Sequence, residues 1–98
     1  MAKGYVYAEI EVTHPDEYRA EYMTRSGPAV AAFGGRFIVR GGASSVKVGP
    51  DVRRVVVEFE SHARALAFYD SPAYQEAIVH RDRWSHCLRY VILEGAEG

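Results

Sequence analysis

Strand-like and helix-like apolar patterns alternate along this 98-residue chain, and the order of the alternation limits its fold more than any other feature. In residues 3–12, for example, Val6, Ala8 and Ile10 recur with the period of two that is typical of a strand. Such patterns predict strands at residues 3–12, 36–40, 53–59 and 87–93, and interrupted helices at residues 13–33 and 61–80. The β-α-β-β-α-β order predicts an α+β fold in which a four-stranded antiparallel sheet carries both helices on one face.

Capping residues and prolines mark where the helices begin and where they are interrupted. The first helix is expected to start at Thr13 or His14, before a proline that suits the first helical position. Residues 26–28, Ser-Gly-Pro, are expected to interrupt it, because proline lacks an N–H and glycine is a weak helix former. Ser61 and Ser71 are expected to cap the two pieces of the second helix, and residues 81–86 to form an irregular connector.

Length and charge exclude several classes of protein. The chain is long enough for one domain, which we expect to span residues 1–98 with its core in residues 3–95. A formal net charge of -1 and a third strand with few aromatic residues argue against a nucleic-acid partner. The longest uncharged run, residues 26–35, is too short to cross a membrane, and no signal core follows Met1. One cysteine cannot form an internal disulfide, so we expect a cytoplasmic protein without a membrane partner.

The predicted strands have apolar side chains on both faces, although the helices can cover only one face. The three valines at residues 55–57 contribute to both faces, and Tyr5 and Tyr7 lie opposite the apolar face of the first strand. An exposed apolar face of more than a few hundred Å² usually marks an interface. We therefore expect a two-fold homodimer with the helix-free faces packed together, in which Glu9 and Arg40 line pockets between the two sheets.

Arg40 is the first candidate for binding a ligand, because a guanidinium can hold a carboxylate with two parallel hydrogen bonds. The alternative is a salt bridge between Arg40 and Glu9. Gly41 and the following glycine would let a ligand approach the backbone, and at least one of them should have a positive φ. Tyr7 and Glu9 share a strand face and can line the same pocket, where a glutamate with a raised pKa could accept a proton; the alternative is simple packing.

The end of the second predicted helix supplies further candidates. His80 and Arg81 either complement the helix dipole or act as a pocket acid/base and an anion contact. Tyr69 and Trp84 are expected to edge the same pocket. The histidines lie on different elements without the spacing of four that places two ligands on one metal, so neither a metal nor a cofactor is expected. Cys87 is expected to be a small buried hydrophobe.

Short motifs throughout residues 3–95 resemble the domain of unknown function 1330 family. The motifs are Lys3-Gly4-Tyr5, Thr13-His14-Pro15-Asp16-Glu17-Tyr18, Gly34-Gly35-Arg36-Phe37, Val39-Arg40-Gly41-Gly42, Arg54-Val55-Val56-Val57-Glu58-Phe59, Ala65-Leu66-Ala67-Phe68-Tyr69 and Ser71-Pro72-Ala73-Tyr74-Gln75. The resemblance implies a dimeric α/β barrel of ferredoxin-like topology and no established activity. Distant relatives of that architecture include cofactor-independent monooxygenases, muconolactone isomerases, haem-dependent chlorite dismutases and stress-response barrels. His14 departs from the aspartate that is usual in the family.

Three classes of function follow from these features. In the first, the chain is a non-catalytic dimer that binds a small acidic or aromatic molecule between sheet and helices. In the second, it is a cofactor-independent enzyme that acts on a small aromatic or carbonyl substrate, with Glu9 and His80 as catalytic candidates. In the third, it is a structural or interaction module. An enzyme should have a pocket with a titratable group of strongly shifted pKa. A binding module should have a pocket without a poised base, and an interaction module a flat sheet face without a pocket.

Overall fold

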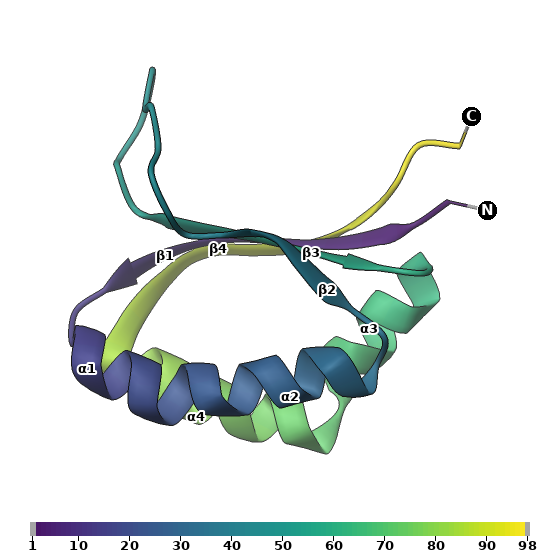
Figure 1. Ribbon diagram of the computed structural model, residues 1–98, viewed down its shortest axis with the longest axis horizontal. Coiled ribbons are helices and arrows are strands. Elements are labelled where there is room, and N and C mark those ends of the chain that lie inside the picture. The colour runs from purple at the N-terminus through teal and green to yellow at the C-terminus, as the bar shows by residue number, and fades with distance from the viewer. Residues whose placement is uncertain (1, 98) are drawn as a thin grey trace.

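A computed structural model describes residues 2–97 and shows one antiparallel sheet covered by helices on a single face (Figure 1). The strands lie in the order β2-β3-β1-β4. Their bounds are β1 Gly4–Val12, β2 Arg36–Arg40, β3 Arg53–Phe59 and β4 Ser85–Glu94, and the helices are α1 Pro15–Glu17, η1 Tyr18–Met23, α2 Thr24–Ala32, α3 His62–Asp70 and α4 Pro72–Trp84. All strand pairs are antiparallel, so the predicted α+β fold is confirmed.

The core lies between the sheet and the helices. Val6, Ala8 and Ile10 of the central strand β1 are each 2% exposed and face the helices, as their spacing predicts. Phe59, Phe68 and Tyr74 are also buried there, and the Phe68 and Tyr74 ring centroids lie 4.5 Å apart. Burying these side chains is the main favourable term that holds the helices on the sheet.

The first helical region is continuous, which differs from the predicted interruption at residues 26–28. α1, η1 and α2 follow one another without a break, and Pro28 lies inside α2. The interior proline costs about 3 kcal/mol of helix propensity. Tyr22 before it and Val30 after it are both buried in the core, and that tertiary burial outweighs the local cost. His14 stands at the N-cap position of α1 but makes no side-chain capping bond.

The second helical region confirms both predicted caps and contradicts the predicted connector. Ser61 Oγ accepts a hydrogen bond from Arg64 N at 3.1 Å, and Ser71 Oγ accepts one from Tyr74 N at 3.2 Å. α4 continues to Trp84 and β4 begins at the next residue, so residues 81–86 do not form an irregular connector. At the end of α4 the Trp84 carbonyl accepts hydrogen bonds from the backbone N–H groups of Thr13 and His14, which follow β1, so this carbonyl is not left without a partner.

Two β-bulges change which face some side chains occupy. The β2–β3 register shifts between Phe37 and Val39, and the β1–β4 register shifts beside Ile10. Because of the first bulge, Phe37 and Arg40 both lie on the helix-facing side, although strict alternation would separate them. Gly41 and the next glycine have φ values of 68° and 87°, which confirms the turn predicted there.

Candidate functional site

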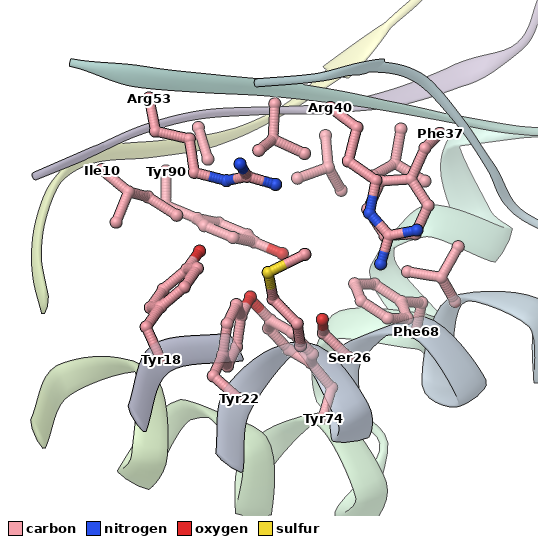
Figure 2. Close-up of a pocket in the computed structure, with 16 residues that line it drawn as sticks. Ile10, Tyr18, Tyr22, Ser26, Phe37, Arg40, Arg53, Phe68, Tyr74 and Tyr90 are labelled. Carbon is pink, nitrogen blue, oxygen red and sulfur yellow. The ribbon is translucent and has the colours of Figure 1, made fainter. Parts of the chain in front are cut away.

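A cavity of about 30 Å³ lies between the helix-facing side of the sheet and the helices (Figure 2). Most of its wall is apolar. The polar part of the wall consists of two arginines, four tyrosines and one serine: Arg40, Arg53, Tyr18, Tyr22, Tyr74, Tyr90 and Ser26. The Arg40 and Arg53 side chains extend into the cavity from the sheet, and the Tyr18, Tyr22 and Ser26 side chains extend into it from the helix layer (Figure 2). The enclosed space holds about two water-sized groups.

The two arginines face the cavity without a carboxylate partner. Arg40 pairs in register with Val55, and Arg53 lies two residues before Val55 on the same strand face. None of the ion pairs formed by residues 2–97 includes either arginine. Arg53 Nε is buried and has no hydrogen-bond partner within this part of the chain. Arg40 is packed against the Phe37 ring, 4.0 Å from its centroid. The site therefore presents two cations ready to accept an anion.

Gly41 allows the Arg53 side chain to lie where it does. A Cβ atom at Gly41 would collide with Arg53 Nη1, whereas one at Gly42 would meet no atom within 4 Å. The Gly41 N–H also donates a hydrogen bond to Arg54 O at 2.8 Å, which fixes the turn. The pair of glycines therefore has two roles: both adopt a positive φ, and Gly41 alone leaves room for the arginine.

The tyrosines form a connected cluster beneath the arginines. The Tyr22 and Tyr74 hydroxyls are 2.7 Å apart, and the Tyr74 and Tyr90 rings stack with centroids 5.8 Å apart. Burial raises the pKa of Tyr18 to about 12 and raises the pKa of Tyr22 well above its ordinary value. These phenols are therefore neutral hydrogen-bonding groups at physiological pH and not anions.

A π-helical segment supplies this tyrosine face. η1 has the wider i→i+5 turn, and such segments occur frequently at functional sites. The segment contains Tyr18 and Tyr22, and Ser26 follows one turn later in α2. All three side chains are buried and line the cavity. The change of pitch thus places three hydroxyl-bearing side chains on one side of a single helical rod.

Tyr7 and Glu9 do not join Arg40, which contradicts the predicted convergence of these residues. They lie on the helix-free face, where Tyr7 OH donates a hydrogen bond to Glu9 Oε2 at 2.7 Å. The cation beside Glu9 is Arg89, with Nε 3.7 Å from Oε1, so the expected Glu9–Arg40 salt bridge is wrong as well. The reason is the β2 bulge, which turns Arg40 to the opposite face of the sheet.

The other predicted site residues lie beside the cavity and not in its wall. Tyr69 packs against the Tyr90 ring at 5.4 Å, and Arg81 Nη1 donates to Tyr74 OH at 3.4 Å. Trp84 packs edge-on against His14 at 5.2 Å, and His80 is half-buried on α4. Only Tyr69 and Arg81 of this set therefore contact the tyrosine cluster. Cys87 is half-buried, and burial raises the pKa of its thiol.

The sequence pattern did not single out Arg53 or the hydroxyl-bearing residues of the cavity as site residues. One signal was present: Arg53 is in phase with Val55 and Val57, so alternation alone places an arginine on the core face of that strand. A second signal was the spacing of Tyr18, Tyr22 and Ser26 at intervals of four. That spacing is also typical of an apolar helix face, and the tyrosine hydroxyl groups have no separate signature in the pattern.

The wall of the cavity carries no conventional acid or base. Among the described residues that line it there is no aspartate, glutamate, histidine or cysteine. Residues 2–97 contain no group of three potential ligands close enough to hold a metal ion. In the same part of the chain no helix has the length and apolar character needed to cross a membrane. The polar groups of the lining are the guanidinium groups of two arginines and the hydroxyl groups of four tyrosines and one serine.

The sequence of residues 3–96 matches the family model described as Domain of unknown function (DUF1330). A search of curated proteins found no match. The fold is similar to that of a protein of unknown function from Rhodopseudomonas palustris, with 22% identity and a TM-score of 0.71, covering 99% of this chain and 85% of that chain.

Two further solved structures have the same fold. SnoaB, a cofactor-independent oxygenase from Streptomyces nogalater, is 10% identical with a TM-score of 0.68, covering 100% of this chain and 97% of that one. A dimeric ferredoxin-like protein of unknown function from Thermobifida fusca is 14% identical with a TM-score of 0.56, covering 98% and 92% of the two chains. At these identities the likeness shows a shared ferredoxin-like fold and nothing about activity.

Proposed function

Since this chain belongs to the DUF1330 family, for which no function is described, we propose a function from its cavity: the protein binds a small organic acid between the sheet and the helices. The observation that carries this proposal is the pair of arginines, Arg40 and Arg53, that face an apolar cavity without a carboxylate partner within residues 2–97. A buried guanidinium nitrogen without a hydrogen bond is costly, and a ligand carboxylate would satisfy it.

The rest of the cavity fits the apolar body of such an acid. Val6 and Val55 on the sheet side and Phe68 on α3 supply hydrocarbon contacts. The enclosed volume of about 30 Å³ is smaller than pentanoate or benzoate, so binding an acid of that size requires side chains of the lining to move. Met23 also lines the cavity, and its unbranched side chain can move to admit a larger ligand. Arg40 is more exposed than Arg53, so the carboxylate is expected near the mouth and the hydrocarbon inside.

The lining of the cavity favours a binding function over a catalytic one. The cavity wall lacks a carboxylate or imidazole, and the pKa of Tyr18 is raised by burial, away from neutrality. A base poised near physiological pH is therefore missing from the described lining. The alternative is a cofactor-independent oxygenase acting on a small aromatic or carbonyl substrate. Its support is the likeness of fold to the oxygenase SnoaB.

The helix-free face is the proposed homodimer interface. Val56 and Val91 lie on this face, and Leu93 beside them is 50% exposed. The charges on the face pair with one another, Glu9 with Arg89 and Glu58 with Arg36, which lowers the cost of covering them. The similar protein from Thermobifida fusca is dimeric, which supports the same assembly here. If no dimer forms, the face remains available to another protein, as in the interaction-module alternative.

Titration with simple acids tests the proposed binding function. Pentanoate and benzoate should shift the amide resonances of residues around the cavity, whereas pentanol and benzyl alcohol should bind at least about tenfold more weakly, because they lack the charge. Arg53→Gln should lower affinity for the acids by a similar factor. Arg64→Gln, at an exposed arginine on α3, is the matched control and should leave affinity unchanged.

The same titration separates the alternatives. If neither acid binds at millimolar concentration, the proposed function is wrong. Oxygen uptake on addition of 4-hydroxybenzoate, lost in Arg53→Gln, would favour the oxygenase. Equal affinity for pentanoate and pentanol would show that the arginines do not select the ligand.

A further inference from the structure

Arg81 is a charged side chain held in the interior beside the cavity. Its side chain extends from α4 and is 9% exposed. Its guanidinium lies 5.2 Å from the Tyr90 ring centroid, and its Nη1 donates a hydrogen bond to Tyr74 OH at 3.4 Å. Asp82, which is more exposed, accepts from Nε at 3.0 Å. A buried cation is expensive, so the contacts that it makes inside the protein indicate what it does there.

The charge of Arg81 sets the direction of the hydrogen bond between the two buried tyrosines. Tyr74 oxygen accepts from Arg81, and the positive guanidinium favours a Tyr74 proton that points away from it. Tyr22 OH lies 2.7 Å from Tyr74 OH and can accept that proton. Burial raises the pKa of both tyrosines, so each keeps its proton. Either hydroxyl can be the donor at this distance, and the charge of Arg81 favours Tyr74 as the donor and Tyr22 as the acceptor.

When Tyr22 accepts the hydrogen bond from Tyr74, its own hydroxyl proton is free to be donated into the cavity. Tyr74 is the hydrogen-bond partner of the Tyr22 hydroxyl within residues 2–97, and that bond uses one of its acceptor sites. The Tyr22 side chain lines the cavity, and Ser26, also buried, lies on the next helical turn. Figure 2 shows both side chains in the helix layer, facing the Arg53 and Arg40 side chains on the sheet side.

We propose that Arg81, Tyr74 and Tyr22 form a polarised hydrogen-bond chain whose free donor binds a second oxygen of the ligand. The preferred ligand is then a carboxylate that also carries a carbonyl or hydroxyl oxygen. This inference rests on the proposed function, because the arginines hold the carboxylate while Tyr22 holds the other oxygen. A site built around a buried donor discriminates against an analogue that lacks the matching oxygen, since the donor is then left unpaired.

Matched acids test the chain without any variant. The probes are pentanoate, 2-oxopentanoate and 4-oxopentanoate, which share one carbon skeleton and differ in the position of a carbonyl oxygen. At least one of the oxo acids should bind about tenfold more tightly than pentanoate. If pentanoate binds and neither oxo acid binds more tightly, this inference is overturned and the proposed function stands. If none of the three binds, the proposed function fails together with the inference.

Variants then assign the preference to the chain. Tyr22→Phe should reduce the ratio of oxo-acid affinity to pentanoate affinity to about one. Tyr18→Phe removes another cavity hydroxyl that is outside the chain and should keep the preference. Arg81→Gln should reduce the preference although Arg81 does not line the cavity, which a purely structural role would not do. Equal loss in Tyr18→Phe and Tyr22→Phe would contradict the chain.

Discussion

Single residues decide where the Arg53 side chain lies at the sheet face of the cavity. Arg53 is placed by the strand, but its guanidinium has room only because residue 41 has no side chain. Gly41 and Gly42 therefore differ in consequence although both have a positive φ. Gly41 is needed for the position of Arg53 as well as for the turn, whereas Gly42 is needed for the turn alone.

Gly41→Ala and Gly42→Ala should separate these two roles. Both substitutions place alanine at a positive φ and should destabilise the protein by about 1 kcal/mol or more. Only Gly41→Ala also displaces Arg53, so it alone should weaken pentanoate binding, by about tenfold. Calorimetric titration and thermal unfolding of the two variants measure both effects. Equal affinities in the two variants would show that Gly41 does not position the arginine.

The buried phenol of Tyr18 predicts how stability falls at high pH. Burial raises the pKa of Tyr18 from its ordinary 10.0 to about 12 in the folded protein. The unfolded chain therefore loses this proton first, and the contribution to stability is complete below pH 10 and lost as pH rises through about 12. A shift of this size corresponds to about 2–3 kcal/mol. Tyr18→Phe should move the alkaline midpoint, followed by circular dichroism, to higher pH; an unchanged midpoint would exclude Tyr18 as a determinant.

At the scale of elements, alternation predicts a strand face only as far as the first bulge. In β1 the alternation holds through the core-facing residues, and Val6, Ala8 and Ile10 are buried as predicted. In β2 an extra residue near Ile38 reverses the phase, and Arg40 lies on the face opposite the one predicted. A bulge has no clear signal in one sequence, because it depends on how the strand fits its neighbours. Tertiary packing also explains why the helix continues through Pro28, because the burial of nearby side chains outweighs the low helix propensity of proline.

The two serine caps give an element-scale prediction with an internal control. Ser71 Oγ accepts from Tyr74 N at 3.2 Å and donates to Phe68 O at 2.7 Å, and the residue is buried. Ser61 makes one capping bond, to the exposed Arg64 N–H. Ser71→Ala should therefore cost about 1.5–3 kcal/mol and Ser61→Ala about 1 kcal/mol, measured by urea unfolding. A larger loss at Ser61 would mean that the α3–α4 junction is not the more important cap.

At the scale of the whole molecule, one face of the sheet is not covered by the helices (Figure 1). The connection between β2 and β3 and the residues after β4 both rise on the helix-free side of the sheet (Figure 1). Between them lies the face that carries Tyr7, Val56 and Val91, on strands whose other face is the core. The domain measures 38 × 35 × 17 Å, and the view down its shortest axis shows the sheet as one layer with the helices on one side of it (Figure 1). Pairing of two such layers would bury the uncovered face of each.

The proposed dimer predicts stability that depends on protein concentration. A stable interface of this kind should bury about 1,200–2,000 Å² in total. The Tm should rise by a few degrees for each tenfold increase in concentration, and light scattering should give a mass of about 22 kDa, twice the 11.0 kDa of one chain. Val91→Asp places a charge on the helix-free face and should abolish this dependence or prevent folding. Val79→Asp, at an exposed valine of α4, should retain it. A folded 11 kDa particle at micromolar concentration would contradict the homodimer and leave the cavity, which each chain forms alone, to be tested separately.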